Sequence, residues 1–360
     1  MATQTTTSLS THTSSTSTPS CTTAVPDRNG YVPVEACNAQ WAYSPSFPAA
    51  IALAVLFGLL TLAHLTLAIT FRKRFCWVII MAATWETVSF ILRALGSRKQ
   101  QNGGYALGTQ LLFLLAPLWI NAFVYMTAGR LIYFLHPEKK IWSFKAISLG
   151  KWFVWLDIVS FIVQGSGGMM LSPEMDEKTM NIGKTIYMSG VGLQQFFIFL
   201  FIGLIVKFQL DVQVLERQGL LGAGKNGKWW KWLTYSLYAV LVLITMRIIF
   251  RLVEFSAGVD PEKNELPYKE SYALGLDAFP MMLALLILVV VHPGLVLRGS
   301  ESEFPSRKER KAEKKEKKRV KKEEKLERKE ERKARKEGKS NDGFVEVEMG
   351  RYERVESMRR

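Results

Sequence analysis

Hydrophobic residues fill the middle of this chain, whereas polar residues dominate both of its ends. Between residues 47 and 297, seven apolar segments of about 20–30 residues alternate with short polar stretches. A helix needs about 20 apolar residues to cross a membrane. We therefore predict an all-α integral membrane protein, a bundle of seven transmembrane helices over residues 47–71, 75–95, 106–135, 152–171, 185–206, 232–257 and 271–297.

The segment before the first predicted helix, residues 1–46, is rich in Ser and Thr. Its first 26 residues include 16 Ser or Thr and no Lys, Arg, Asp or Glu. Such a composition buries too little apolar surface to fold, so we expect disorder. The segment has no charged and apolar regions typical of a cleaved signal peptide. Cys21 and Cys37 form either a disulfide or two free thiols.

The C-terminal tail, residues 298–360, accounts for much of the net charge of +15. Its many Lys and Arg residues, interspersed with Glu, favour a solvated and charged helix. The excess positive charge would be attracted to anionic lipids of the inner leaflet, and cytoplasmic proteins are further possible partners. Nucleic-acid binding is the usual alternative for such a run, but the seven apolar segments disfavour it.

The charges of the loops predict an orientation in the membrane. With the N-terminus outside, the cytoplasmic loops hold 12 basic and three acidic residues, and the outer segments hold seven basic and nine acidic residues. Cytoplasmic loops are typically enriched in Lys and Arg. We therefore expect an outside N-terminus and a cytoplasmic C-terminus.

One predicted helix carries charged residues deep within an apolar run. Arg247, Arg251 and Glu254 have the spacing i, i+4 and i+7, which places them on one helix face. One charge at the centre of a membrane costs roughly 2.5–3.5 kcal/mol on insertion scales. We expect this face to be turned toward protein or a hydrated cavity. Alternatively, Arg251 and Glu254 only pair with each other or extend to the interface.

The predicted helices contain four acidic and four basic side chains. Their depths along the helices predict two clusters. The inner cluster is a structural ion pair between Arg130 and Asp157. The outer cluster, a hypothetical substrate-binding or gating site, consists of Glu86, Arg93, Arg247, Arg251, Glu254 and Asp277. Uncharged polar residues would extend this polar interior, namely Asn121, Tyr125, Gln164 and Gln194.

The sequence does not favour an enzyme. Residues 222–228 match the phosphate-binding pattern G-x4-G-K, but Trp229 replaces the magnesium-binding Ser or Thr, and no strand precedes them. The histidines lack the spacing of metal ligands. His136-Pro137 and His292-Pro293 fit helix ends, because proline cannot continue a helix. We predict no catalytic residue, no metal and no cofactor.

Six motifs in order resemble a known family. They are Glu86-x6-Arg93, Leu115-Ala116-Pro117-Leu118 through Arg130, Asp157 through Gly168, Gly190 through Gln194, Arg247 through Gly258, and Asp277 through Gly294. Together they are similar to the fungal RTA-like family of lipid-translocating exporters, over about residues 40–298. The family usually has Gly-Tyr where this chain has Ser89-Phe90, and a small residue in place of Asn121.

The resemblance implies a seven-helix protein that exports or flips sphingoid bases or similar amphiphiles and gives resistance to toxic amphiphiles such as aminosterols. One type of relative is associated with porphyrin uptake. A charged headgroup needs a polar track through the membrane, which the buried charges would supply. The alternative from another class is a seven-helix sensor or receptor for lipid or membrane stress.

Overall fold

The computed structural model describes a helical membrane domain and parts of the charged tail. The described residues are 22–34, 36, 38–142, 144–171, 176–221, 229–256, 264–297, 299, 303–305, 308–312, 315–316, 318–330 and 332. The chain divides into two units, residues 1–303 and 304–360. The second unit is helical and exposed over most of its described part, as its dense charge favours. Residues 222–228, which match G-x4-G-K, and both N-terminal cysteines lie outside the described residues.

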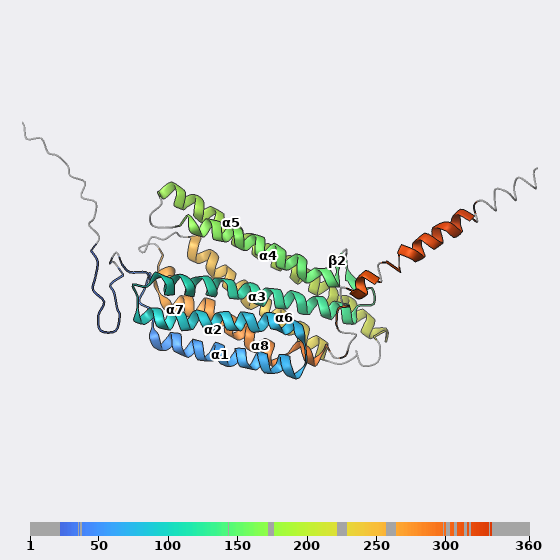
Figure 1. The fold of residues 1–360 in the computed structure, drawn as a ribbon, viewed down its shortest axis with the longest axis horizontal. Helices are drawn as coiled ribbons and strands as arrows, with labels where there is room; N and C mark the ends of the chain where they lie inside the picture. The colour runs from blue at the N-terminus through green and yellow to red at the C-terminus, as the bar shows by residue number, and fades with distance from the viewer. Residues whose placement is uncertain are drawn as a thin grey trace, which may run out of the picture. The chain divides into compact units, whose positions relative to one another are not determined.

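Seven helical spans form most of the described part of the first unit (Figure 1). The helices are α1 (Phe47–Thr70), α2 (Trp77–Arg98), α3 (Gly103–Leu135), α4 (Ala146–Met169), α5 (Glu177–Arg217), α6 (Trp229–Ser256), α7 (Glu270–Ala273) and α8 (Phe279–Val290). The seventh span combines α7, a π-helical segment at Leu274–Ala278, and α8. Each span is long and apolar enough to cross a membrane, as the sequence predicts.

Short elements connect these spans. They are the 3₁₀ helices η1 (Arg74–Cys76), η2 (Leu266–Tyr268) and η4 (Pro293–Leu295), and a small hairpin of β1 (Lys140–Ile141) and β2 (Phe144–Lys145). The hairpin is antiparallel, with Ile141 opposite Phe144. Helix α8 ends just before His292-Pro293, as the sequence predicts, because proline has no amide hydrogen with which to continue the helix.

Several helices extend beyond their predicted limits. Helix α5 has 41 residues against the 22 of the predicted segment 185–206. At 1.5 Å per residue it is about 60 Å long, twice the hydrocarbon thickness. Its first turn is capped by Asp176, whose carboxylate accepts hydrogen bonds from the hydroxyl and amide of Thr179. These bonds lower the pKa of Asp176. Hydropathy locates the apolar part of a helix but not its polar extensions.

The helices form a closed ring of neighbours. Going round it, α1 packs on α2, α2 on α3, α3 on α4, α4 on α5, α5 on α6, α6 on α8 and α8 back on α1. Helix α3 also contacts α6 across the ring. The largest fully buried side chains include Phe57, Tyr125, Phe201 and Trp230. The core therefore lies along the axis of the bundle and is filled with aromatic and aliphatic side chains.

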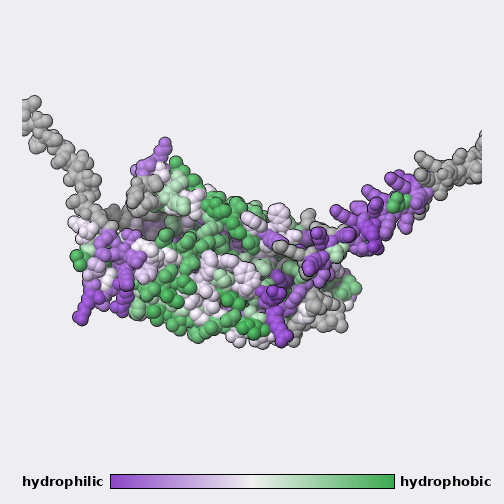
Figure 2. All heavy atoms as spheres, in the orientation of Figure 1, coloured by the Kyte–Doolittle hydropathy of each residue, from purple (hydrophilic) through white to green (hydrophobic). Residues whose placement is uncertain are grey.

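The outer surface of the bundle is hydrophobic. On the face seen in Figure 2, a broad band of hydrophobic side chains crosses the middle of the bundle, and hydrophilic side chains lie toward its ends. Exposed side chains within the helices include Leu62 of α1, Ile162 of α4 and Phe199 of α5. Exposed Trp77, Trp152 and Trp232 lie near the starts of α2, α4 and α6, at one end of the bundle. Tryptophan is enriched at membrane interfaces, so both features fit a bundle surrounded by lipid.

The N-terminal segment is not disordered throughout, which corrects the prediction for residues 1–46. Residues 1–21 lie outside the described range, but the following residues pack on the bundle. Val32 is buried, and its amide donates to Gln100 Oε1 at 3.1 Å. Gly30 has φ +81° and lies so close to the carbonyl of Arg98 that a Cβ would clash. Serine and threonine fall away after residue 23, and Trp41 and Tyr43 supply the apolar surface that the earlier residues lack. We call this end of the bundle the capped end.

Candidate functional site

The centre of the predicted outer cluster lies on the inward face of α6. Arg247, Arg251 and Glu254 are 6–7% exposed. Asp277, in the π-helical segment, is fully buried and faces them. Its Oδ1 accepts a hydrogen bond from Arg247 Nε, and its Oδ2 lies 2.5 Å from an Arg251 guanidinium nitrogen. Arg251 also donates to Glu254 at 3.0 Å. The charged stripe thus faces the interior of the bundle rather than lipid, and Asp277 bridges its two arginines.

The position of Asp277 depends on an irregular turn. The π-helical segment Leu274–Ala278 widens the last span, and Pro280 lies two residues beyond its end. Proline cannot donate to the carbonyl four residues earlier, which interrupts the regular α-helical ladder. Single π-helical turns in α-helices are frequent at functional sites. Here the turn carries the carboxylate that bridges two arginines.

Glu86 of α2 lies at the edge of this cluster. It is fully buried, and it interacts electrostatically with Arg247 and Asp277. Neither of its carboxyl oxygens has a hydrogen-bond partner among the described residues. Phe90, one turn along α2, stacks on Phe57 and packs edge-on against Phe113. Glu86 therefore lies between a charged cluster and an aromatic one.

Helix α3 covers the arginines with an aromatic ring. The guanidinium carbons of Arg247 and Arg251 each lie 5.9 Å from the ring centroid of Phe113. The backbone carbonyl of Phe113 also accepts from Arg247 at 3.5 Å. Guanidinium groups within about 6 Å of an aromatic ring are attracted to its face. The cluster is thus held by α2, α3, α6 and the π-helical segment together.

Arg93 forms a separate site, nearer the capped end. Its guanidinium donates to Glu270 Oε1 at 2.9 and 3.2 Å, and to the hydroxyl of Tyr43 at 2.5 Å. The other carboxylate oxygen of Glu270 accepts from the amide of Ser46 at 2.8 Å. Arg93 therefore joins α2, the start of α7 and the N-terminal segment. Sequence analysis missed Glu270 because it directly precedes the predicted seventh span. An acidic residue at a helix start was the available signal.

The structure does not form the predicted ion pair between Arg130 and Asp157. Asp157 Oδ2 instead accepts from the side-chain amide of Asn121 at 3.0 Å, and Tyr125 lies beside the same carboxyl group. Arg130 lies 4.0 Å from the Phe75 ring centroid and donates to the carbonyl of Met126. Asn121 and Arg130 are nine residues apart on α3, or about 13 Å along the axis. Asp157 lies at the level of Asn121, too far along the helix for Arg130.

The remaining polar residues hold helices together. Gln164 of α4 donates to Gln194 of α5 at 3.0 Å, and both are buried. Between these helices, a Cβ at Gly190 would lie 2.9 Å from the backbone nitrogen of Gln164. Small residues allow such close approach of membrane helices, and polar side chains then bond across the contact. Of the four predicted polar-interior residues, Asn121 and Tyr125 surround Asp157, while Gln164 and Gln194 connect α4 to α5.

At the end of the bundle opposite the capped end, two histidines are buried. His292 Nδ1 accepts from the amide of Gly294 at 3.1 Å, and its ring stacks on Phe71. His64 contacts the carbonyl of Leu285. The thiol of Cys76 is 3.6 Å from His292. No group of three His, Cys, Asp or Glu in the described ranges is placed to hold a metal ion.

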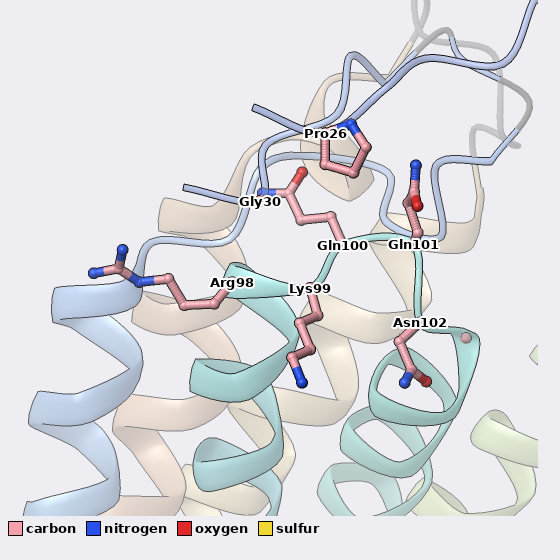
Figure 3. A pocket seen from close by; sticks show the side chains of 8 residues that line it. Pro26, Gly30, Arg98, Lys99, Gln100, Gln101 and Asn102 are labelled. Atoms are coloured by element: carbon pink, nitrogen blue, oxygen red, sulfur yellow. The ribbon is translucent and has the colours of Figure 1, made fainter. Parts of the chain in front are cut away.

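A cavity of about 560 Å³ lies on the capped end (Figure 3). Its lining comes from the N-terminal segment, the end of α2 and the connection to α3, and includes Pro26, Arg98, Lys99 and Asn102. Gln100, also on this lining, accepts the hydrogen bond from Val32 described above. The cavity is therefore a polar recess of the N-terminal cap and is built by different residues from the charge cluster.

The apolar belt, the closed ring of seven spans and the buried ion pairs define an integral, multi-pass membrane protein. Comparisons with known proteins specify it further. The sequence model of the RTA1 like protein family matches residues 79–300. The chain belongs to this family.

Several characterised or named fungal proteins are similar to this chain. It is 44% identical to the probable lipid transporter atnI of Emericella nidulans over 303 residues, which cover 82% of this chain and 79% of the relative. It is 30% identical to Protein RTM1 of Saccharomyces cerevisiae, covering 57% and 63%. It is 29% identical to protoporphyrin uptake protein 1 of the same species, covering 57% and 64%. No solved structure matches the chain.

Proposed function

We propose that this protein moves a lipid or a similar amphiphile across a membrane, and that its headgroup passes the buried cluster of Glu86, Arg247, Arg251, Glu254 and Asp277. The cluster itself carries the proposal. Charges at membrane depth are costly, and in membrane proteins they commonly mark substrate or ion pathways. The name of the 44% identical relative, a probable lipid transporter, supports the same function.

The substrate class that fits is an amphiphile with a charged headgroup, of which the sphingoid bases are an example. Its apolar chain would stay among hydrophobic side chains, while its head would exchange contacts with charged groups. Resistance to toxic amphiphiles would follow from their export. The sequence offers no nucleotide-binding or catalytic motif for this movement, so we propose that the protein is not an enzyme.

The test is transport of a fluorescent long-chain base in liposomes that contain the purified protein. The base should cross in the presence of the wild-type protein, and Arg247→Gln should reduce crossing by at least tenfold. Arg98→Gln is the matched control, because Arg98 is an arginine outside the cluster that lies over Phe47 at the end of α2. Crossing at the protein-free rate with the wild type, or equal loss in both variants, would contradict the proposal.

The second candidate function is a sensor of lipid or membrane stress. The tail favours it, because its described helix is exposed and highly charged, and it would present a surface to cytoplasmic proteins and anionic lipids. In that case, deletion of residues 304–360 should abolish a stress response in cells but leave transport in liposomes unchanged.

We further propose that the protein lies in the plasma membrane with the capped end outside. The loop charges support this orientation. An epitope inserted at residue 10 should be accessible on intact cells, and one at residue 350 only after permeabilisation. The opposite labelling would contradict this orientation and place the capped end on the cytoplasmic side.

A further inference from the structure

The charges of the cluster do not balance if every acid is ionised. Arg247 and Arg251 are two cations, and Asp277 and Glu254 are the two carboxylates that contact them. These four side chains form a neutral set. Glu86 is a third acid beside it, fully buried and in electrostatic contact with Arg247 and Asp277. Ionised Glu86 would leave the cluster with one uncompensated negative charge inside the bundle.

The contacts of Arg247 show which form of Glu86 the structure fits. Arg247 directs its Nε to Asp277 and an outer nitrogen to the carbonyl of Phe113. It forms no ion pair with Glu86, although both side chains are buried in the bundle. A buried carboxylate without a partner is far more costly than a buried neutral carboxyl group without hydrogen bonds. The arrangement therefore fits a protonated Glu86 better than an ionised one.

The other helices around Glu86 bring no further charge to it. Helix α1 carries one ionisable side chain, His64, which contacts Leu285, and α8 carries none. On α3, Tyr125 lies beside Asp157 and Arg130 lies over Phe75. Its other two tyrosines, Tyr105 and Tyr133, lie toward its two ends. Within α2 itself, Arg93 is held by Glu270 and Tyr43. The groups that decide the ionisation of Glu86 are thus those of the cluster.

We propose that Glu86 is a proton-binding site at which one proton exchanges for one organic ammonium headgroup. When such a cation enters the cluster, the O–H bond of Glu86 breaks, the proton leaves to water, and the carboxylate pairs with the cation. The total charge of the cluster is zero before and after the exchange. When the proton returns, it displaces the cation. No oxidation or reduction takes place.

This exchange would supply the energy for the transport proposed above. It rests on that proposed function for one point, the lipid chain of the ligand. Because proton and cation compete for one carboxyl group, a proton gradient would drive the cation in the opposite direction. The proposal also names the charge of the substrate. A site that is neutral with Glu86 protonated gains a negative charge when the proton leaves, and so favours a cation over an anion or a zwitterion.

Proton release upon binding tests the exchange without requiring transport. The purified full-length protein is mixed with dodecyltrimethylammonium in weakly buffered detergent containing a pH-indicator dye, and binding is measured by calorimetry in parallel. This probe is a permanent cation and has no proton of its own to release. We expect about one proton released for each cation bound. Tetramethylammonium, which has the headgroup but no long chain, tests whether a free cation is sufficient. Proton release with both probes identifies a site for cations in general. Proton release with the long-chain probe alone identifies a lipid site.

Two variants assign the proton. Glu86→Gln keeps the shape of the protonated side chain, so it should fold, and it should release no proton. Asp157→Asn is the matched control, since Asp157 is another buried acid outside the cluster, and it should release as much as the wild type. On cation binding, the infrared absorption of a protonated carboxylic acid should decrease in the wild type and in Asp157→Asn, and it should not change in Glu86→Gln. Absence of cation binding, binding without proton release, or release that persists in Glu86→Gln would overturn the proposal.

The two proposals fail in distinguishable ways. If the long-chain base crosses liposomes with the wild-type protein but no proton is released on binding, the transport function stands and the exchange is wrong. If protons are released in the wild type and not in Glu86→Gln, yet the base does not cross, the site exists and the transport function is wrong.

Discussion

Two buried carboxylates of the bundle, Asp277 and Asp157, are stabilised in different ways. Asp277 bridges Arg247 and Arg251 near the capped end. Asp157 contacts the uncharged Asn121 and Tyr125 between α3 and α4. The first belongs to a charged set that would respond to the charge of a ligand, whereas the second belongs to a neutral hydrogen-bonded contact. The comparison shows that burial of an acid alone does not identify a functional site, because the charge of its partners decides what it can bind.

The largest effect is expected from Asp277→Asn. This change leaves two arginines without their shared carboxylate, and removal of one partner of a buried ion pair typically costs about 3–5 kcal/mol. Unfolding by heat or denaturant in detergent should show a loss of this size. If Asp277→Asn were as stable as the wild type, the ion pairs of Asp277 would not contribute to stability, and the contrast between Asp277 and Asp157 would be wrong.

Arg93→Gln should have a smaller and more local effect. It removes charged hydrogen bonds to Glu270 and Tyr43, which are worth about 1.5–3 kcal/mol each in typical proteins and less where water has access. We expect faster hydrogen exchange in residues 40–46, because Arg93 fixes this part of the N-terminal segment. Arg217→Gln is the control, because Arg217 lies at the far end of α5 and is exposed, and it should leave exchange in these residues unchanged.

The smallest effect is expected for the coupling between Arg130 and Asp157. Since the two do not form an ion pair, the effects of Arg130→Gln and Asp157→Asn on the free energy of unfolding should add within about 0.5 kcal/mol. The double mutant and both single mutants provide the measurement. A coupling of several kcal/mol would show that Arg130 and Asp157 interact directly, contrary to the structure, in which Asp157 bonds to Asn121.

Periodicity and depth predicted part of this arrangement. The spacing of Arg247, Arg251 and Glu254 placed them on one face, because the helical repeat is fixed. Depth along the helices also assigned Asp277 and Glu86 to the same cluster. The helical repeat does not say how neighbouring helices are rotated relative to one another. The depths estimated from the sequence were also too inexact to show that Arg130 and Asp157 lie at different levels. The prediction that Arg93 lies toward the outer end of α2 agrees with the structure. Arg93 pairs with Glu270, however, and does not join the cluster.

Other features depended on tertiary structure that the sequence pattern does not specify. The N-terminal segment was judged by its Ser- and Thr-rich start, although Trp41, Tyr43 and Val32 carry apolar surface that docks on the bundle. The role of Phe113 has no sequence signal, since one phenylalanine in an apolar helix is ordinary. The protonated form suggested for Glu86 follows only from a count of charges after their contacts are known.

Photolabelling tests most directly whether the cluster is the site where an amphiphile binds. A long-chain amine with a photoreactive group next to its nitrogen is bound to the purified protein, irradiated, and located by mass spectrometry of peptides. Our account predicts labels on α2 near Glu86, on α3 near Phe113 and on α6 between residues 247 and 254, each suppressed by excess unlabelled amine. Labels confined to the lipid-facing surface, such as Trp152 and Phe199, and unaffected by competitor, would contradict it.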